Sequence, residues 1–228
     1  MIEKHISYVI EELLNIMNRR TPRFKTRTSA GRELGEALCE ADIDADSVFA
    51  IPRGGLPLGR CVADALAVPL DVIVAQKISD PNNPEFAIGA VTADGNVWFN
   101  ERALDQRDID QAYIDRTQAM EAENARIKAE RYRNGGNRPD LRNKAVVIVD
   151  DGIATGATAR ACIKAVQDDN PKQIVLAVPV GSRRAIDELS ADVSDILCLK
   201  TPAQFRAVGQ HYEQFNQVSD EEALSYLG

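Results

Sequence analysis

Short apolar segments that alternate with helix-like segments are the feature that most restricts the fold of this chain. Five such segments occur between positions 47 and 200: "SVFAIP", "LDVIVAQKI", "AVVIVD", "QIVLAVPV" and "DILCLK". Near-continuous apolar runs of this length are typical of strands buried on both faces of a parallel sheet. The pattern therefore predicts an α/β fold with a parallel five-stranded core sheet flanked by helices. Ligands of such sheets bind beyond the carboxyl ends of the strands.

Length and composition are those of an ordinary soluble domain. The chain has 228 residues, 44% of them hydrophobic and 27% charged, which suits a single domain over 1–228. No apolar run reaches the roughly 20 residues of a membrane span, and the first residues carry acids where a signal peptide would be apolar. The net charge of −8 argues against a general nucleic-acid surface. We expect a cytoplasmic protein with no membrane partner.

Cysteine and histidine usage narrows the possible chemistry. The four cysteines are isolated in sequence, without a CxxC pair, so buried reduced thiols are favoured over two disulfides. The only histidines are His5 and His211. Two histidines give little support to a Ser-His-Asp hydrolytic site or a histidine-rich zinc site.

Two helices are predicted before the first strand. Residues 2–18 carry an apolar stripe at helical spacing. Ser29 is expected to cap the following helix, "AGRELGEALCEA", through its hydroxyl oxygen. The core of the domain is expected at about 29–200.

An insertion interrupts the alternation between the second and third apolar segments. Residues 79–100 are expected to form a flexible loop and a hairpin, because Asp94-Gly95 lies between two β-like runs. One long helix is predicted at 103–134, stopped by the two glycines that follow it. This helix is mostly polar, which favours a solvent-exposed outer element, with a dimer contact as the alternative.

The stretch "AVVIVDDGIATGAT", residues 145–158, indicates a phosphate site. A strand that ends in small residues and opens a helix presents unpaired backbone N–H groups at the positive end of the helix. Gly152, Gly156 and Ala157 let the backbone approach a ligand, and Thr155 and Thr158 add hydroxyl donors. No lysine follows the second glycine, so this is not a Walker A loop.

Two adjacent carboxylates precede this loop. Asp150 and Asp151 would repel a bare phosphate at contact distance, so they must face hydroxyl donors, a divalent cation or a developing positive charge. A sugar phosphate fits, with its phosphate in the loop and its ring hydroxyls on the carboxylates. The structural alternative is a strand–turn–helix unit in which the acids only cap the helix.

The same stretch resembles the signature of type I phosphoribosyltransferases, which bind 5-phosphoribosyl-1-diphosphate (PRPP). Four aliphatic residues, two acids and a loop of small and hydroxyl residues align with the family signature. Gly152 departs from this signature, because the family usually has an aliphatic residue or serine there. The resemblance implies the type I fold and a loop that binds the 5′-phosphate of PRPP. This loop consists of Gly152, Ile153, Ala154, Thr155, Gly156, Ala157 and Thr158.

Further segments extend the resemblance over most of the chain. "IPRGGLPLG" resembles the family's pyrophosphate loop, which implies that Arg53, Gly54 and Gly55 bind the diphosphate, with Lys77 as the next basic candidate. "KISDPNNPEFAIGAV" lies where these enzymes carry a mobile catalytic loop, and Glu85 within it is a candidate base. The segment is also similar to a group of predicted phosphoribosyltransferases with an "NPEFA-GA" loop.

Residues 201–228 are expected to form a hood over the acceptor. In "TPAQFRAVGQHYEQF", the order of Phe, Val and Gly resembles the purine-stacking segment of hypoxanthine-guanine enzymes, one residue out of step. Phe205 could stack on a base, with Tyr212 nearby, and the alternative is that these aromatics belong to the core.

The resemblance implies transfer of the 5-phosphoribosyl group from PRPP to a nitrogen acceptor, with release of pyrophosphate. A nucleobase is expected as the small-molecule acceptor, with a purine favoured, as in nucleotide salvage. Mg²⁺ is expected to arrive with PRPP, with Asp150 and Asp151 acting on it indirectly. Members of the family are often homodimers. Two alternatives remain: a PRPP- or nucleotide-sensing regulator without turnover, and a ribosyl-phosphate hydrolase or phosphorylase.

Overall fold

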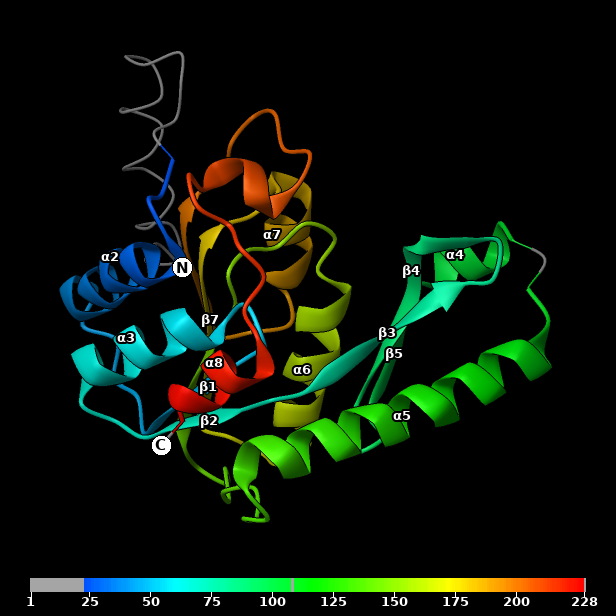
Figure 1. Cartoon of the computed structure of the whole chain (residues 1–228), viewed down its shortest axis with the longest axis horizontal. Coiled ribbons are helices and arrows are strands. Elements are labelled where there is room, and N and C mark those ends of the chain that lie inside the picture. The colour runs from blue at the N-terminus through cyan, green and yellow to red at the C-terminus, as the bar shows by residue number, and fades with distance from the viewer. Residues whose placement is uncertain (1–22, 108, 228) are drawn as a thin grey trace.

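The chain folds into a core and a projecting arm (Figure 1). The structure is a computed structural model that describes residues 23–107 and 109–227. The predicted helix at 2–18 lies outside the described residues. Within these ranges no helix combines the length and the apolar character that a bilayer crossing requires.

The core contains a five-stranded parallel sheet with the strand order β2-β1-β6-β7-β8. All four neighbouring pairs in this sheet are parallel, as the apolar segments predict. The strands are β1 (Ser47–Ala50), β2 (Leu70–Val72), β6 (Ala145–Val149), β7 (Gln173–Val180) and β8 (Asp195–Lys200).

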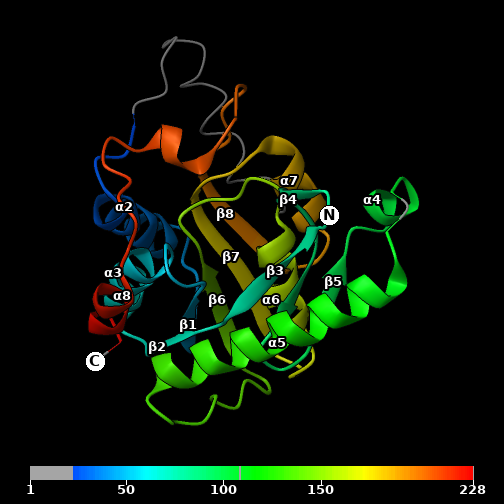
Figure 2. The same ribbon diagram turned by 45° about the vertical axis from the view of Figure 1, so that its right-hand side comes forward.

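Helices cover both faces of the core sheet (Figure 2). Alternate residues of β6 point to opposite faces of the sheet. On one face, Val147 and Val149 pack in a hydrophobic cluster with residues of α2 (Arg27–Glu40) and α3 (Leu56–Leu66). Val146 and Ile148 pack in the cluster of α6 (Ala157–Gln167) and α7 (Arg183–Leu189). A strand buried on both faces has no polar alternation, which explains the uninterrupted apolar run.

The first described helix begins earlier than predicted. Thr26, not Ser29, is the N-cap of α2, and its hydroxyl oxygen accepts from the Ser29 N–H at 3.1 Å. The Ser29 hydroxyl oxygen accepts in turn from the Thr26 N–H at 2.9 Å. Ser29 is therefore the third residue of a capping box, and Arg27 is brought into the first turn of the helix.

The arm consists of a three-stranded antiparallel sheet and two helices. Its strands β3 (Ala75–Asp80), β4 (Asn83–Thr92) and β5 (Val97–Phe99) lie in that order. The segment "LDVIVAQKI" is thus not one strand, because β2 ends at Val72 in the core sheet and β3 begins at Ala75 in the arm. The hairpin at Asp94-Gly95 is confirmed: β4 and β5 pair in antiparallel fashion, and Gly95 has φ +84°.

The helix predicted at 103–134 is divided in two. α4 (Glu101–Asp105) is capped by Asn100, and α5 (Gln111–Arg133) by Asp110, each of which accepts a backbone N–H through its side chain. The predicted end is confirmed, since Asn134 and Gly135 adopt positive φ values of +49° and +78°.

The C-terminal segment returns over the core. It contains the short 3₁₀ helix η1 (Val208–His211) and the helix α8 (Asp220–Ser225). Ala223 of α8 packs in one cluster with Leu56 of α3 and Ala129 of α5. This segment therefore touches both the core and the arm.

Candidate functional site

Two loops meet where neighbouring core strands end. β1 and β6 pair in register up to Ala50 and Val149, so the segments that follow them emerge at the same edge of the sheet. A Cβ atom on Gly54 would lie only 2.1 Å from Oδ2 of Asp151. A Cβ on Gly55 would lie 2.6 Å from the carbonyl oxygen of Ile51. Glycine is therefore required for the "RGG" loop to reach the aspartate loop.

The predicted phosphate loop encloses a small hollow of about 190 Å³. Gly156, with φ +78°, begins α6 without a side-chain cap, so the first N–H groups of this helix remain available for an anion. Ile153 donates to Val180, and the Ser182 hydroxyl donates to the Ala154 carbonyl at 2.6 Å, which fixes the loop. Every residue of the predicted 5′-phosphate loop, 152–158, lines this hollow together with Asp150. Val208 from the hood also lines it, and the sequence did not single out this residue.

Of the aspartate pair, Asp150 lines this hollow and Asp151 follows it in the chain. The Asp151 N–H donates to Oδ1 of Asp150 at 2.8 Å. Burial raises the pKa of Asp150 well above its ordinary value, and the Asp151 carboxylate raises it further. Burial also raises the pKa of Asp151, although the guanidinium of Arg27 opposes this effect. Two carboxyls in this arrangement resist being ionised together, so the pair favours positive or proton-donating partners.

Arg27 is a site residue that the sequence analysis missed. Its Nε donates to Oδ2 of Asp151 at 2.8 Å, and both side chains are mostly buried. The guanidinium stacks on the Phe215 ring at 3.8 Å and donates to the Asn216 carbonyl at 2.6 Å. Arg27 therefore links α2, the aspartate loop and the hood.

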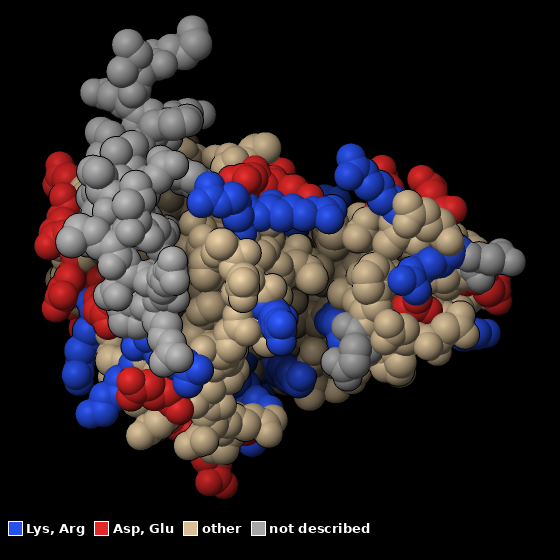
Figure 3. Space-filling view, turned by 90° about the horizontal axis from the view of Figure 1, so that it is seen from above, with Lys and Arg blue, Asp and Glu red and all other residues tan. Residues whose placement is uncertain are grey.

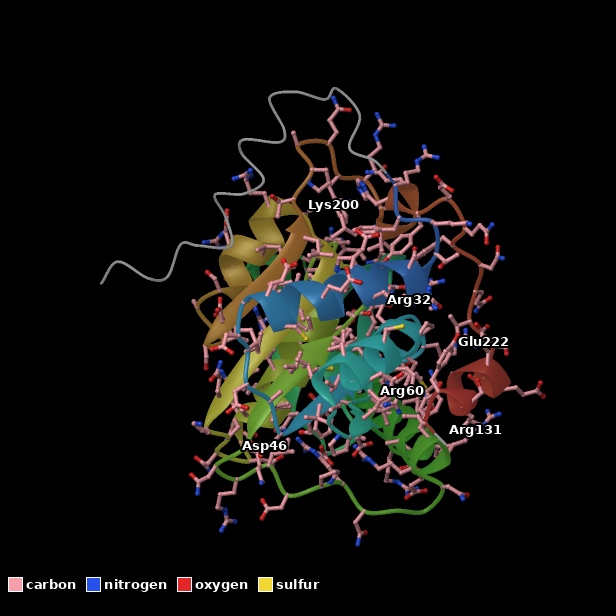
Figure 4. All side chains as sticks on the ribbon, turned by 90° about the vertical axis from the view of Figure 1, so that its left-hand side faces the viewer. Arg32, Asp46, Arg60, Arg131, Lys200 and Glu222 are labelled. Carbon is pink, nitrogen blue, oxygen red and sulfur yellow. The ribbon has the colours of Figure 1, made fainter. Side chains whose placement is uncertain are left out.

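Arg53 forms an ion pair with the C-terminal helix. Its Nη1 lies 3.4 Å from Oδ1 of Asp220, and Oδ2 of Asp220 lies 2.7 Å from Nη1 of Arg131. The Tyr132 hydroxyl also donates to this carboxylate, at 3.5 Å. Arg131 lies on α5 beside the helix that carries Glu222 (Figure 4). Two arginines thus converge on one acidic side chain next to the "RGG" loop.

Lys77 and Glu85 belong to the arm. Lys77 does not end a core strand as predicted, because it lies within β3, where its Nζ donates to the Pro84 carbonyl at 2.8 Å. It lines a large cleft between the arm and the core, and Arg53 is not among the residues that line this cleft. The structure therefore does not bring the two predicted pyrophosphate residues together. Glu85 lies within β4, also in the arm.

The two predicted acceptor residues have different environments. Tyr212 is 3% exposed and packs between Phe24 and Phe215, and its hydroxyl donates to the Asp151 carbonyl at 2.6 Å. Contrary to the prediction, Tyr212 supports the aspartate loop and has no open face for an acceptor. Phe205 is half-buried and stacks on His211, with ring centroids 5.2 Å apart.

The chain belongs to the phosphoribosyl transferase family. The family described as "Phosphoribosyl transferase domain" matches residues 29–214, and the parallel sheet flanked by helices is the type I fold. The structure of the protein TT1426 from Thermus thermophilus is 38% identical, covers 90% of this chain and 97% of its own, and superposes with a TM-score of 0.76.

Two curated relatives are also similar over much of the chain. A Mycobacterium tuberculosis protein named provisionally as a phosphoribosyl transferase is 39% identical over 204 residues, or 90% of this chain and 46% of that protein. A hypoxanthine/guanine phosphoribosyltransferase of Methanocella paludicola is 28% identical over 160 residues, or 69% of this chain and 64% of that protein. The chain spans about half the length of the first relative.

Proposed function

We propose that this chain transfers the 5-phosphoribosyl group of PRPP to a nitrogen of a nucleobase, with a purine favoured, and releases pyrophosphate. The observation that carries the proposal is the hollow at the start of α6, lined by Asp150, with the neighbouring Asp151 against the "RGG" loop. Membership of the phosphoribosyl transferase family supports it. The role would be nucleotide salvage in the cytoplasm.

Each group has a defined task in this proposal. The free N–H groups at the start of α6, within the loop 152–158, bind the 5′-phosphate, and Asp150 and Asp151 accept from the ribose hydroxyls. As pyrophosphate leaves, positive charge develops at the anomeric carbon, and the two carboxylates stabilise it. Arg53 leaves Asp220 to bind the diphosphate, with Gly54 and Gly55 giving it backbone access. Lys77 and Glu85 would contribute only when the arm approaches the core.

Magnesium fits this site as a cation that arrives with PRPP. Among the described residues there is no group of three or more His, Cys, Asp or Glu side chains that could hold a metal ion. The donors present, Asp150 and Asp151, are oxygen ligands suited to Mg²⁺ or to ribose hydroxyls. When bound, Mg²⁺ would neutralise the leaving diphosphate. Phe205, being half-buried in the hood, is the remaining candidate for stacking on the acceptor.

The test is release of pyrophosphate from Mg·PRPP across a panel of purine and pyrimidine bases. Release that depends on one base supports the proposal and identifies the acceptor. Binding of Mg·PRPP without release under any condition would identify a sensor. Release without any base would identify a hydrolase, and phosphate-dependent cleavage of a nucleotide would identify a phosphorylase.

A further inference from the structure

A cleft between the arm and the core is much larger than the phosphate hollow. Its volume is about 1520 Å³, and it is walled by β5 and α4 on the arm and by α6 and α7 on the core. Seen from above, a hollow separates the two parts, with Lys and Arg side chains along its walls (Figure 3). A space of this size exceeds what a ribose phosphate fills.

The charge of the cleft is opposite to that of the whole chain. Three acidic side chains line it, Glu101, Glu188 and Asp192, against six basic ones, in a chain with a net charge of −8. The basic residues are Lys77, Arg102, Arg107, Arg160, Lys164 and Arg184. A cleft with a local excess of cations concentrates anions by focusing the electrostatic field.

Not all of these cations are neutralised by carboxylates. Lys164 donates to the Val97 carbonyl at 3.0 Å, and Lys77 donates to the Pro84 carbonyl. Among the described residues neither lysine forms an ion pair.

The cleft is separate from the phosphate hollow. The two share the tip of the loop, including Thr155 and Thr158, but Asp150 and Val208 line only the hollow. A ligand held by the rest of the cleft would therefore not contact Asp150. This position suits a second anion and does not suit an acceptor that must reach the anomeric carbon.

We propose that the cleft between the arm and the core binds a polyphosphate anion, either free or as the tail of a nucleotide. Lys164 on α6 and Arg102 on α4 face it from opposite walls, so the bound anion ties the arm to the core. The site acts as an effector site, because it adjoins the 5′-phosphate loop but is lined by neither the aspartate pair nor Arg53.

The cleft carries its own spectroscopic reporter. Trp98 is the only tryptophan of the chain, and it lines the cleft with its ring under the Arg160 guanidinium, 5.1 Å from the ring centroid. An anion that attracts Arg160 would alter this contact and change the emission of Trp98. Titration with inorganic tripolyphosphate should give a saturable change that weakens as the salt concentration rises.

Matched variants locate the binding. Lys164→Gln combined with Arg102→Gln removes two charges and keeps amide donors, and should weaken tripolyphosphate binding about tenfold or more. Lys172→Gln, an exposed lysine that does not line the cleft, should leave the affinity unchanged. Saturating ribose 5-phosphate should not displace tripolyphosphate.

Calorimetry with ATP distinguishes the two sources of the anion. A higher affinity for ATP than for tripolyphosphate would identify a nucleotide ligand. Equal affinities would identify a free polyphosphate as the ligand. The proposal is overturned if there is no saturable Trp98 signal, if the double variant binds as the wild type does, or if ribose 5-phosphate competes. None of these outcomes depends on pyrophosphate release, so failure here leaves the proposed transferase activity standing.

Discussion

At the residue scale, the aspartate pair decides whether the site recognises a phosphoribosyl ligand. The raised pKa of Asp150 means that the free protein holds a proton on the pair at a pH where an ordinary aspartate has lost it. Ribose hydroxyls and Mg²⁺ bind the ionised carboxylate, so ligand binding should expel this proton. By linkage, affinity for Mg·PRPP should rise with pH until the carboxyl ionises unaided.

The first prediction is that Asp150→Asn weakens Mg·PRPP binding on the order of 10- to 100-fold and abolishes the proton release. Calorimetric titration in two buffers of different ionisation enthalpy measures both quantities. Asp151→Asn should weaken binding similarly. Wild-type affinity in both variants would contradict the assignment, and loss of folding would indicate that the acids serve only the structure.

The second prediction concerns Arg27. Arg27→Met leaves Asp151 without its cation in a mostly buried site, so the pKa of Asp151 should rise and the pH at which Mg·PRPP binds should move upward. Loss of one partner of the pair should also lower the free energy of unfolding by about 2 kcal/mol, less than a fully buried pair would lose. Arg32→Met, on the exposed side of the same helix (Figure 4), is the control and should change neither quantity. If the pH dependence of Mg·PRPP binding were unchanged in Arg27→Met, Arg27 would have no role in positioning Asp151.

These residues differ in how far the sequence could reveal them. Asp150, Asp151 and the phosphate loop are contiguous, so their spacing alone indicates their chemistry. Arg27 reaches Asp151 across 124 positions, and Arg53 reaches Asp220 across 167. Contacts of that kind depend on tertiary packing, and no local pattern signals them.

At the element scale, the arm explains both the success and the failure of the strand predictions. Asp94-Gly95 is a local turn signal, and the hairpin formed there. Between β2 and β3 the chain passes from the core sheet to the arm through Ile73 and Val74, both buried. An apolar junction without glycine or proline cannot be distinguished by sequence from the middle of a strand.

The third prediction is that residues 79–86, where β3 turns into β4, act as a lid over the site. Residues 79–86 begin the segment that the sequence predicts as a flexible loop and hairpin, but most of them lie in β3 and β4, where the pairing register shifts on both sides of Ser79. We expect faster amide exchange at 79–86 than at 87–92, with protection on binding Mg·PRPP and acceptor. Asp80→Asn, which removes the ion pair with Arg107, should accelerate exchange further. Equal protection of both segments in the free protein would defeat the lid.

At the scale of the whole molecule, the arm projects from the core and leaves one side of α5 uncovered (Figure 1). Ile114, Ala125, Ala129 and Tyr132 bury the other side. Met120 and Ile127, two turns apart and therefore on one face, are 56% and 52% exposed. They are the only large hydrophobic side chains so exposed in the described part of the chain.

The last prediction is that two copies of the chain associate through this face of α5. The 23 residues of α5 span about 35 Å, enough for a helix pair to contribute to a stable interface of roughly 1,200 Å² or more. Met120→Glu with Ile127→Glu places two like charges at the centre of this face and should convert a dimer to a monomer in light scattering. Gln111→Glu with Lys128→Gln changes the net charge of α5 equally at other exposed positions and should preserve the dimer. A wild-type chain that stays monomeric at high micromolar concentration, or a dimer that survives the first pair of substitutions, would show that α5 is not the interface.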